Sequence, residues 1–275
     1  MDKKIIITAA VTGSRTTKEM NPAVPYTPEE TIQAALDCQK AGASIVHIHV
    51  RDPQTGAPDY KEETFREILE GIREKSDIIV NLTTSGFSLA STDMIDERIM
   101  PVYLKPDMCS YDLGSFNRRD KTFLNTPQWG KRAAVIMQEM GVKPEIEVFD
   151  VGHIQQANDF IERGLIDDPP YFQLCMGVKW GVGGEPEDLL FMKSKLPKGS
   201  LWSVLGVQKF QLPMITMSMI LGGHVRVGFE DNIYLKKGVL FRDNAHAVEM
   251  AADLAERMGR NVATAQEART MLGLK

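Results

Sequence analysis

Cysteine is scarce in this sequence of 275 residues, and the cysteines present cannot form a disulfide framework or a metal knuckle. Cys38, Cys109 and Cys175 are odd in number and too far apart to make a CxxC pair. Secreted proteins that depend on disulfides carry a dense and even set of cysteines. The sequence therefore predicts a protein of a reducing compartment.

The sequence also lacks an excess of positive charge and a long apolar run. Its 32 basic and 37 acidic residues give a net charge of -5, which offers no extended surface for a polyanion such as nucleic acid. The apolar run at residues 5–11 spans about seven residues, too few for a signal peptide or a membrane span. We therefore expect a cytoplasmic protein that binds neither nucleic acid nor a membrane.

A third absence concerns the glycine-rich turn of dinucleotide-binding proteins. The first apolar run leads into Thr12-Gly13-Ser14-Arg15, which is not the GxGxxG pattern that an open, doubly wound sheet uses to hold a pyrophosphate. The later cluster at residues 181–184 is rich in glycine but follows the sixth predicted strand, where either a phosphate-binding loop or a plain flexible loop would fit. An open doubly wound sheet is therefore the weaker alternative for the fold.

The pattern that is present is an alternation of short β-branched runs with longer amphipathic stretches, repeated about eight times. Helix signals support it, because Thr27-Pro28-Glu29-Glu30 supplies a cap, a proline and acids, and Gly141 is placed to end a helix. The predicted strands are residues 5–11, 45–50, 78–83, 108–111, 145–149, 171–176, 201–205 and 224–228. The predicted helices are residues 27–42, 60–75, 93–100, 127–140, 154–163, 186–195, 209–221, 244–258 and 264–272.

Eight strands that alternate with helices predict one (β/α)8 barrel, the TIM barrel, as an α/β fold. The chain is close to the usual length of about 250 residues for this fold, so we expect residues 1–275 to form a single domain. The last predicted helix, residues 264–272, is an extra C-terminal helix that we expect to pack outside the barrel.

The strongest local signal is the strand segment that carries His47 and His49. Residues two apart on a strand point to the same side, so their Cβ atoms lie roughly 7 Å apart and the two imidazoles can converge on one ion. Inward positions of barrel strands normally carry Val, Ile or Leu, and an unpartnered buried imidazole costs about 1 to 3 kcal/mol. Two hydrogen-bonded core histidines are the alternative, but their position at a strand end favours metal ligands, with zinc ahead of iron or manganese.

A second polar cluster, Arg226 and Glu230-Asp231-Asn232, ends the eighth predicted strand and begins the following loop. In a closed barrel, strands eight and two both flank strand one, so Glu230 can reach the ion that the histidines hold. Three protein ligands leave a coordination position open for substrate, as catalytic sites do. A solvated acidic loop is the alternative interpretation of the three residues after the strand.

Polar residues end other predicted strands too, where this fold places catalytic groups. Thr83-Thr84-Ser85-Gly86 closes the third strand, Ser110 closes the fourth, and Glu145 and Glu147 alternate on the fifth. A hydroxyl bonded to backbone or an exposed strand acid would give the same pattern at any one position. Their joint position predicts an active site at the carboxyl ends of the strands.

With these residues the sequence resembles the β-keto acid cleavage enzyme family, whose founding activity is 3-keto-5-aminohexanoate cleavage. The resemblance covers nearly the whole chain and rests on residues 8–13, 27–30, 41–43, 47–51, 105–106, 144–147 and 222–232. It implies a zinc-dependent (β/α)8 barrel that condenses a β-keto acid with acetyl-CoA and releases acetoacetate and a new acyl-CoA. It also implies a homotetramer.

The resemblance assigns roles to individual residues. It makes His47, His49 and Glu230 the zinc ligands, and Arg226 and Asp231 a catalytic pair in which Asp231 takes the proton that starts the reaction. Glu147 is implied as a catalytic group that contacts the substrate. Thr83 and Ser110 are also implied to contact the substrate, and Ser85 and Gly86, which end the same strand as Thr83, are expected to bind it too.

One position departs from the family pattern. The position of Arg15 is acidic in the family member that acts on an amino-bearing keto acid. There the acidic residue pairs with the ammonium of the substrate. A guanidinium repels a cationic substrate tail and binds carboxylates through paired hydrogen bonds. The sequence therefore predicts an anionic or neutral keto acid, such as 3-oxoadipate or 3-oxoglutarate; the alternative is that Arg15 turns into solvent.

Coenzyme A is expected at the loops after the sixth and seventh predicted strands, residues 179–184 and 206–209, because such loops often form a phosphate site in barrels. Two other functions remain open: a metal-dependent aldolase or isomerase without coenzyme A, and a catalytically silent barrel that binds a small molecule. Arg226, Glu230 and Asp231 beside paired histidines argue against the second, because buried charge is costly if it serves packing alone.

Overall fold

The computed structural model describes residues 4–86, 95–118 and 121–274, and eight parallel strands in it close into a barrel. Around the barrel the strands follow the order β1-β10-β9-β8-β7-β4-β3-β2. The predicted (β/α)8 fold is confirmed, and the open sheet is excluded because β1 pairs with both β2 and β10. The barrel strands are β1 (Ile7–Ala10), β2 (Ile45–Ile48), β3 (Ile79–Leu82), β4 (Met108–Asp112), β7 (Lys143–Val148), β8 (Tyr171–Met176), β9 (Leu201–Gly206) and β10 (His224–Val227).

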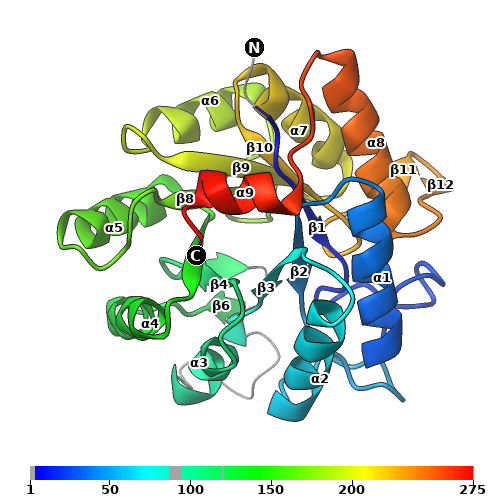
Figure 1. Ribbon diagram of the computed structural model, residues 1–275. Coiled ribbons are helices and arrows are strands. Elements are labelled where there is room, and N and C mark those ends of the chain that lie inside the picture. The colour runs from blue at the N-terminus through cyan, green and yellow to red at the C-terminus, as the bar shows by residue number, and fades with distance from the viewer. Residues whose placement is uncertain (1–3, 87–94, 119–120, 275) are drawn as a thin grey trace.

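Helices surround the barrel on its outside (Figure 1). Thr27 caps the start of the first helix as expected and forms a capping box with Glu30, and Gly141 ends the fourth in a left-handed conformation with φ 69°. The predicted start of the third helix, at Asp93, lies outside the described residues. The surrounding helices are α1 (Pro28–Lys40), α2 (Glu62–Arg73), α3 (Ile95–Tyr103), α4 (Pro127–Met140), α5 (Val151–Glu162), α6 (Pro186–Ser194), α7 (Gln211–Ile220) and α8 (Asn244–Arg257).

The alternation of side chains along each strand separates an outer apolar core from a polar interior. Outward residues such as Val46 and Val80 pack in one large hydrophobic cluster with the helices. The inward positions at the middle of the barrel carry polar side chains that are fully buried, among them Asn81, Glu145 and Gln173. Barrel interiors normally hold branched apolar residues at such positions. Packing alone does not account for this polar layer, so we expect its residues to serve the function of the protein.

The C-terminal helix α9 (Ala265–Leu272) lies across the end of the barrel, in front of the strands in Figure 1. The predicted extra C-terminal helix is present and packs outside the barrel, as a cap over one end. Its Ala268 and Leu272 are fully buried in a cluster with residues at the amino ends of the strands, such as Ile45 and Ile79. Hydrophobic burial against this otherwise open layer explains the position of the helix.

Two short hairpins interrupt the alternation of strands and helices. One, β5 (Phe116–Arg118) with β6 (Lys121–Phe123), follows β4, and the other, β11 (Tyr234–Lys236) with β12 (Val239–Leu240), follows β10. Both therefore extend from the carboxyl ends of barrel strands, the face on which this fold carries its active sites. The sequence pattern predicts neither hairpin.

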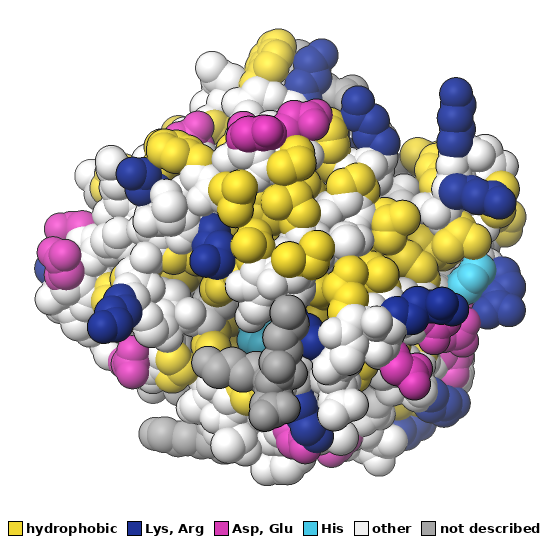
Figure 2. Space-filling model, turned by 90° about the horizontal axis from the view of Figure 1, so that it is seen from above, with side chains coloured by type: hydrophobic (Ala, Val, Ile, Leu, Met, Phe, Trp, Pro, Cys, Tyr) yellow, Lys and Arg dark blue, Asp and Glu magenta, His cyan; other side chains and the backbone are white. Residues whose placement is uncertain are grey.

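Figure 2 shows hydrophobic side chains gathered on the surface over α6 and α7. Phe191 of α6 is 51% exposed, and Leu212 and Ile220 of α7 are 48% and 58% exposed. The opposite side of α7 is also apolar, with Met214, Ile215 and Met219 fully buried.

Among the described residues, no helix has both the length and the apolar character to cross a bilayer.

Candidate metal centre and active site

A cavity of about 290 Å³ opens at the carboxyl ends of the barrel strands. Its walls include Cys175 of β8, Leu205 of β9 and Phe123 of the β5–β6 hairpin. Ten of the eleven residues that sequence reasoning selected for the site line this cavity: Arg15, His47, His49, Thr83, Ser85, Ser110, Glu147, Arg226, Glu230 and Asp231. Gly86 is the exception. It packs against Arg98, where a Cβ would lie 2.7 Å from Arg98 Cδ.

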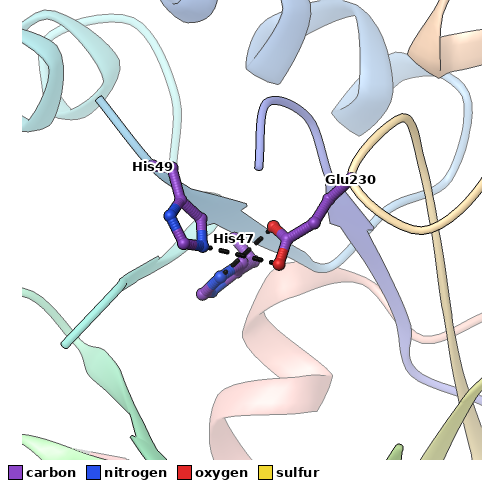
Figure 3. Close-up of side chains that lie close together, drawn as sticks. All are labelled: His47, His49 and Glu230. Carbon is purple, nitrogen blue, oxygen red and sulfur yellow. Dashed lines mark ion pairs between the residues drawn. The ribbon is translucent and has the colours of Figure 1, made fainter. Parts of the chain in front are cut away.

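His47, His49 and Glu230 point toward one another (Figure 3). Glu230 Oε2 lies 3.5 Å from His47 Nε2, and Glu230 Oε1 lies 3.4 Å from His49 Nε2. Barrel closure produces this meeting, because β2, which carries His47, and β10, which leads to Glu230, both pair with β1. The loop that carries Glu230 lies against β1. Glu230 N donates a hydrogen bond to Ala10 O at 3.1 Å, and Gly228 packs so closely on β1 that a Cβ there would lie 2.4 Å from Ala10 O.

The three side chains fit a divalent metal ion. Ligand atoms at about 2.0 to 2.1 Å from a tetrahedral zinc lie about 3.3 Å apart, close to the two measured separations. Glu230 Oε2 and His47 Nδ1 are buried without a hydrogen-bond partner among the described residues, so Glu230 Oε2 is an oxygen that a cation would satisfy. Among the described residues, these three side chains form the group of possible metal ligands, and their ligand atoms all lie within 4.8 Å of one another.

The charge states suit metal ligation as well. Burial, aided by the Arg226 charge, lowers the pKa of His47 well below its ordinary value, so the imidazole is neutral. Burial acts to raise the pKa of Glu230, but the Arg226 guanidinium and the two imidazoles outweigh it and hold that pKa well below its ordinary value. A neutral imidazole and an ionised carboxylate are the forms that bind metal.

Arg226 is the centre of a buried ionic network. Its Nε and Nη2 donate to the two carboxylate oxygens of Asp231 at 3.0 and 3.2 Å, and its Nη1 donates to Glu147 Oε1 at 2.9 Å. Glu230 Oε1 lies 2.7 Å from Nη2, and Glu145 Oε1 lies 3.9 Å from Nη1. One fully buried guanidinium thus lies among four carboxyls and fixes Asp231 through both of its oxygens.

The carboxyls of this network do not all ionise at neutral pH. Burial raises the pKa of Asp231 to about 6 and that of Glu145 to about 7, with Arg226 acting in the opposite direction. Burial, and then the neighbouring carboxyl of Asp112, raise the pKa of Glu147 well above its ordinary value. Asp231 and Glu145 therefore change their protonation near neutral pH, where acid–base catalysts are most effective.

The hydroxyl residues form one polar wall of the cavity. Ser110 Oγ accepts a hydrogen bond from Thr84 N at 3.1 Å, and Thr83 Oγ1 accepts one from Ser85 N at 3.0 Å. These backbone contacts orient the hydroxyls and leave their protons for another acceptor. The wall can donate hydrogen bonds to an anionic ligand.

Sequence reasoning missed two charged residues that line the cavity, Asp112 and Arg118. Asp112 stands two positions after Ser110 on β4, so strand alternation was a signal that could have found it. Arg118 belongs to the unpredicted β5–β6 hairpin, and no periodic signal marks it.

Gly13 packs directly against the Glu230 side chain and backbone. It has φ +62°, and a Cβ at this position would lie 2.6 Å from Glu230 Cγ and 2.9 Å from Glu230 Cα. We expect Gly13→Ala to displace the carboxylate and to weaken binding of a divalent metal by about 10- to 100-fold, as other changes in ligand orientation do. Competition with a chromophoric chelator measures this affinity.

The control for this variant is Gly141→Ala. Gly141 has a similar φ of +69°, but no atom lies within 4 Å of its added Cβ, so the substitution brings the backbone strain without the collision. Equal metal affinities for the two variants would show that Gly13 does not set the position of Glu230.

Comparison with known proteins places the whole chain in one family. Residues 4–274 match the model of the family described as beta-keto acid cleavage enzyme. The chain is 45% identical to the 3-keto-5-aminohexanoate cleavage enzyme of Fusobacterium nucleatum over 277 residues, which cover 100% of both chains. It is 38% identical to the 3-oxoadipate:acetyl-CoA acetyltransferase of Cupriavidus necator, over 100% of this chain and 96% of that one.

The fold has a counterpart among solved structures. A ternary complex of ObcA with a C4-CoA adduct and oxalate matches with a TM-score of 0.78 at 19% identity, over 92% of this chain and 68% of ObcA. At that identity the likeness concerns the fold alone. The full-length sequence matches show that the chain belongs to the β-keto acid cleavage enzyme family, as the motifs predicted.

Proposed function

We propose that this protein is a zinc-dependent β-keto acid cleavage enzyme that uses acetyl-CoA. In the proposed reaction, a keto acid of the form R–CO–CH2–COO⁻ and acetyl-CoA give acetoacetate and R–CO–CoA. The observation that carries the proposal is the meeting of His47, His49 and Glu230 with the Arg226–Asp231 pair in one cavity. Family membership and the acetyl-CoA-dependent activity named for the relative from Cupriavidus necator support it.

The residues of the cavity have separate roles in the proposed reaction. When bound, zinc supplies a Lewis acid that polarises the oxygens of the keto acid. Asp231 takes a proton from the carbon between the two carbonyl groups of the keto acid, and Arg226 holds its carboxylate in place through two hydrogen bonds. Glu147 fixes Arg226 from the other side, and the hydroxyls of Thr83, Ser85 and Ser110 hydrogen-bond the substrate carboxylate.

Coenzyme A is proposed to bind at the loops after β8 and β9. Lys179 and Gln208, one from each loop, line the same cavity as the candidate metal ligands. A thioester bound there would have its acetyl carbon near the keto acid, while Lys179 is available to contact a phosphate.

We propose that the protein self-associates and forms the tetramer that the family resemblance implies. The apolar surface over α6 and α7 supports it, because a helix that is apolar on opposite sides is normally covered on both. Light scattering on the purified protein measures its mass.

The experiment that tests the proposed function is a screen of β-keto acids with acetyl-CoA, in which acetoacetate and the new acyl-CoA are measured. The proposal expects both products in equal amounts and neither from enzyme whose metal has been removed. An aldolase or isomerase would convert keto acids at the same rate without acetyl-CoA. A binding protein would be stabilised by a keto acid and yield no product.

Arg15 is proposed to reject substrates with a cationic tail, because this exposed, positively charged residue lines the cavity. The prediction is that wild type turns over 3-oxoadipate faster than 5-amino-3-oxohexanoate. Arg15→Glu should reverse this order by changing kcat/KM for the charged tails by about 10- to 100-fold in opposite directions. Faster turnover of the amino compound by wild type, the activity named for the relative from Fusobacterium nucleatum, would overturn the assignment.

A further inference from the structure

Arg118 brings a second guanidinium to the cavity. It lies at the end of β5, half-buried, and lines the cavity together with Arg15, which follows β1. The two residues lie far apart in the sequence and reach the cavity from separate segments, one after β1 and one at the end of β5. The keto acid therefore meets cationic side chains from two parts of the catalytic face.

The two guanidiniums act on each other. Burial, and then the positive charge of Arg15, lower the pKa of Arg118, whereas the carboxylate of Glu230 acts in the opposite direction. Like charges close together in a cavity raise each other's free energy, and an anion placed between them removes this cost. Guanidiniums are the side chains best suited to bind a carboxylate, because each offers a planar pair of N–H donors.

The walls near Arg118 include apolar surface for a short carbon chain. Phe123 and Phe149 line the cavity, and Phe116, two residues before Arg118, stacks on Phe149 with a centroid distance of 4.7 Å. This aromatic packing anchors the hairpin and so fixes the backbone that carries Arg118. Methylene groups can lie along the phenyl rings while each end of a ligand meets charged groups.

We propose that Arg118 and Arg15 together bind a second carboxylate, at the end of the substrate remote from its keto acid group, so that the enzyme acts on a β-keto dicarboxylic acid. This inference rests on the proposed function and narrows the anionic or neutral tail to an anionic one. The acyl group passed to coenzyme A then carries a free carboxylate, and acetoacetate remains the other product.

The test compares two keto acids of equal length, 3-oxoadipate and 3-oxohexanoate, which differ by a terminal carboxylate in place of a methyl group. We expect wild type to have the higher kcat/KM for 3-oxoadipate. Arg118→Gln should lower the ratio of the two kcat/KM values by about 10- to 100-fold, mainly through the KM of the dicarboxylate. Lys121→Gln is the matched control, because Lys121 pairs with Arg118 in the hairpin but is exposed.

Two outcomes would overturn the inference. An equal loss for both keto acids in Arg118→Gln would make Arg118 a structural residue of the hairpin, and a raised KM for acetyl-CoA alone would assign it to a phosphate of coenzyme A. Failure of the proposed function looks different, because wild type would then release no acetoacetate from either keto acid with acetyl-CoA.

Discussion

Glu230→Gln should remove most of the bound metal and lower kcat by about a thousandfold. Glu230 supplies the carboxylate of the candidate metal site, and its Oε2 lies 3.5 Å from His47 Nε2. An amide carries no charge, so it loses the attraction to a divalent ion that the carboxylate provides. A Lewis acid that stabilises developing charge contributes several kcal/mol, which corresponds to about three powers of ten in rate. Elemental analysis after gel filtration and the acetoacetate assay measure the two effects.

Asp231→Asn separates metal binding from proton transfer in this experiment. Asp231 is the next residue, is equally part of the Arg226 network, and contacts Arg226 rather than the imidazoles. Its variant should retain metal and lose turnover. Wild-type metal content in Glu230→Gln, or full activity of chelator-treated wild type, would show that the three side chains do not form the catalytic metal site.

The barrel and the position of its histidines follow from local sequence patterns. Alternation of β-branched runs and amphipathic stretches placed the eight strands close to their observed ranges. Period-two alternation predicted that His47 of β2 and His49 directly after it point to the same side. Glu230 required one further step, that closing the barrel brings β10 next to β1 and so near β2. These features depend on contacts between neighbours in a regular topology, which makes them predictable.

Features that depend on the shape of the whole molecule did not emerge from the sequence. The helix α9 covers the barrel end because an apolar layer there needs burial, which is visible only once the strands are assembled. Asn81, which donates a hydrogen bond to Glu145 at 2.8 Å, joins two strands 64 residues apart. Gly86, which the sequence predicts to bind substrate, packs on Arg98 and does not line the cavity.

Arg226→Gln should lower the free energy of unfolding by about 3 to 5 kcal/mol and remove measurable turnover. Arg226 is fully buried and lies within 4 Å of oxygens from Glu145, Glu147, Glu230 and Asp231. Without the guanidinium, these carboxyls remain in a poorly solvated interior with no cation beside them. Their charged forms become costly, so the carboxyls must take up protons or draw in water. Protonation removes the ionised Asp231 that the reaction uses, and water does not restore the two hydrogen bonds that orient it. Urea denaturation and the acetoacetate assay give the two quantities.

Arg226→Lys distinguishes the charge of this residue from its geometry. An ammonium keeps the positive charge but cannot offer paired donors to Asp231 while also reaching Glu147, so most of the stability should return while kcat stays about 100-fold below wild type. Arg242→Gln is the surface control, since Arg242 lies 2.9 Å from Glu249 with both side chains exposed, and an exposed pair contributes about 0 to 1 kcal/mol. If Arg226→Lys had the kcat of wild type, the two-oxygen contact with Asp231 would have no part in catalysis, and the charge of Arg226 would account for its whole effect.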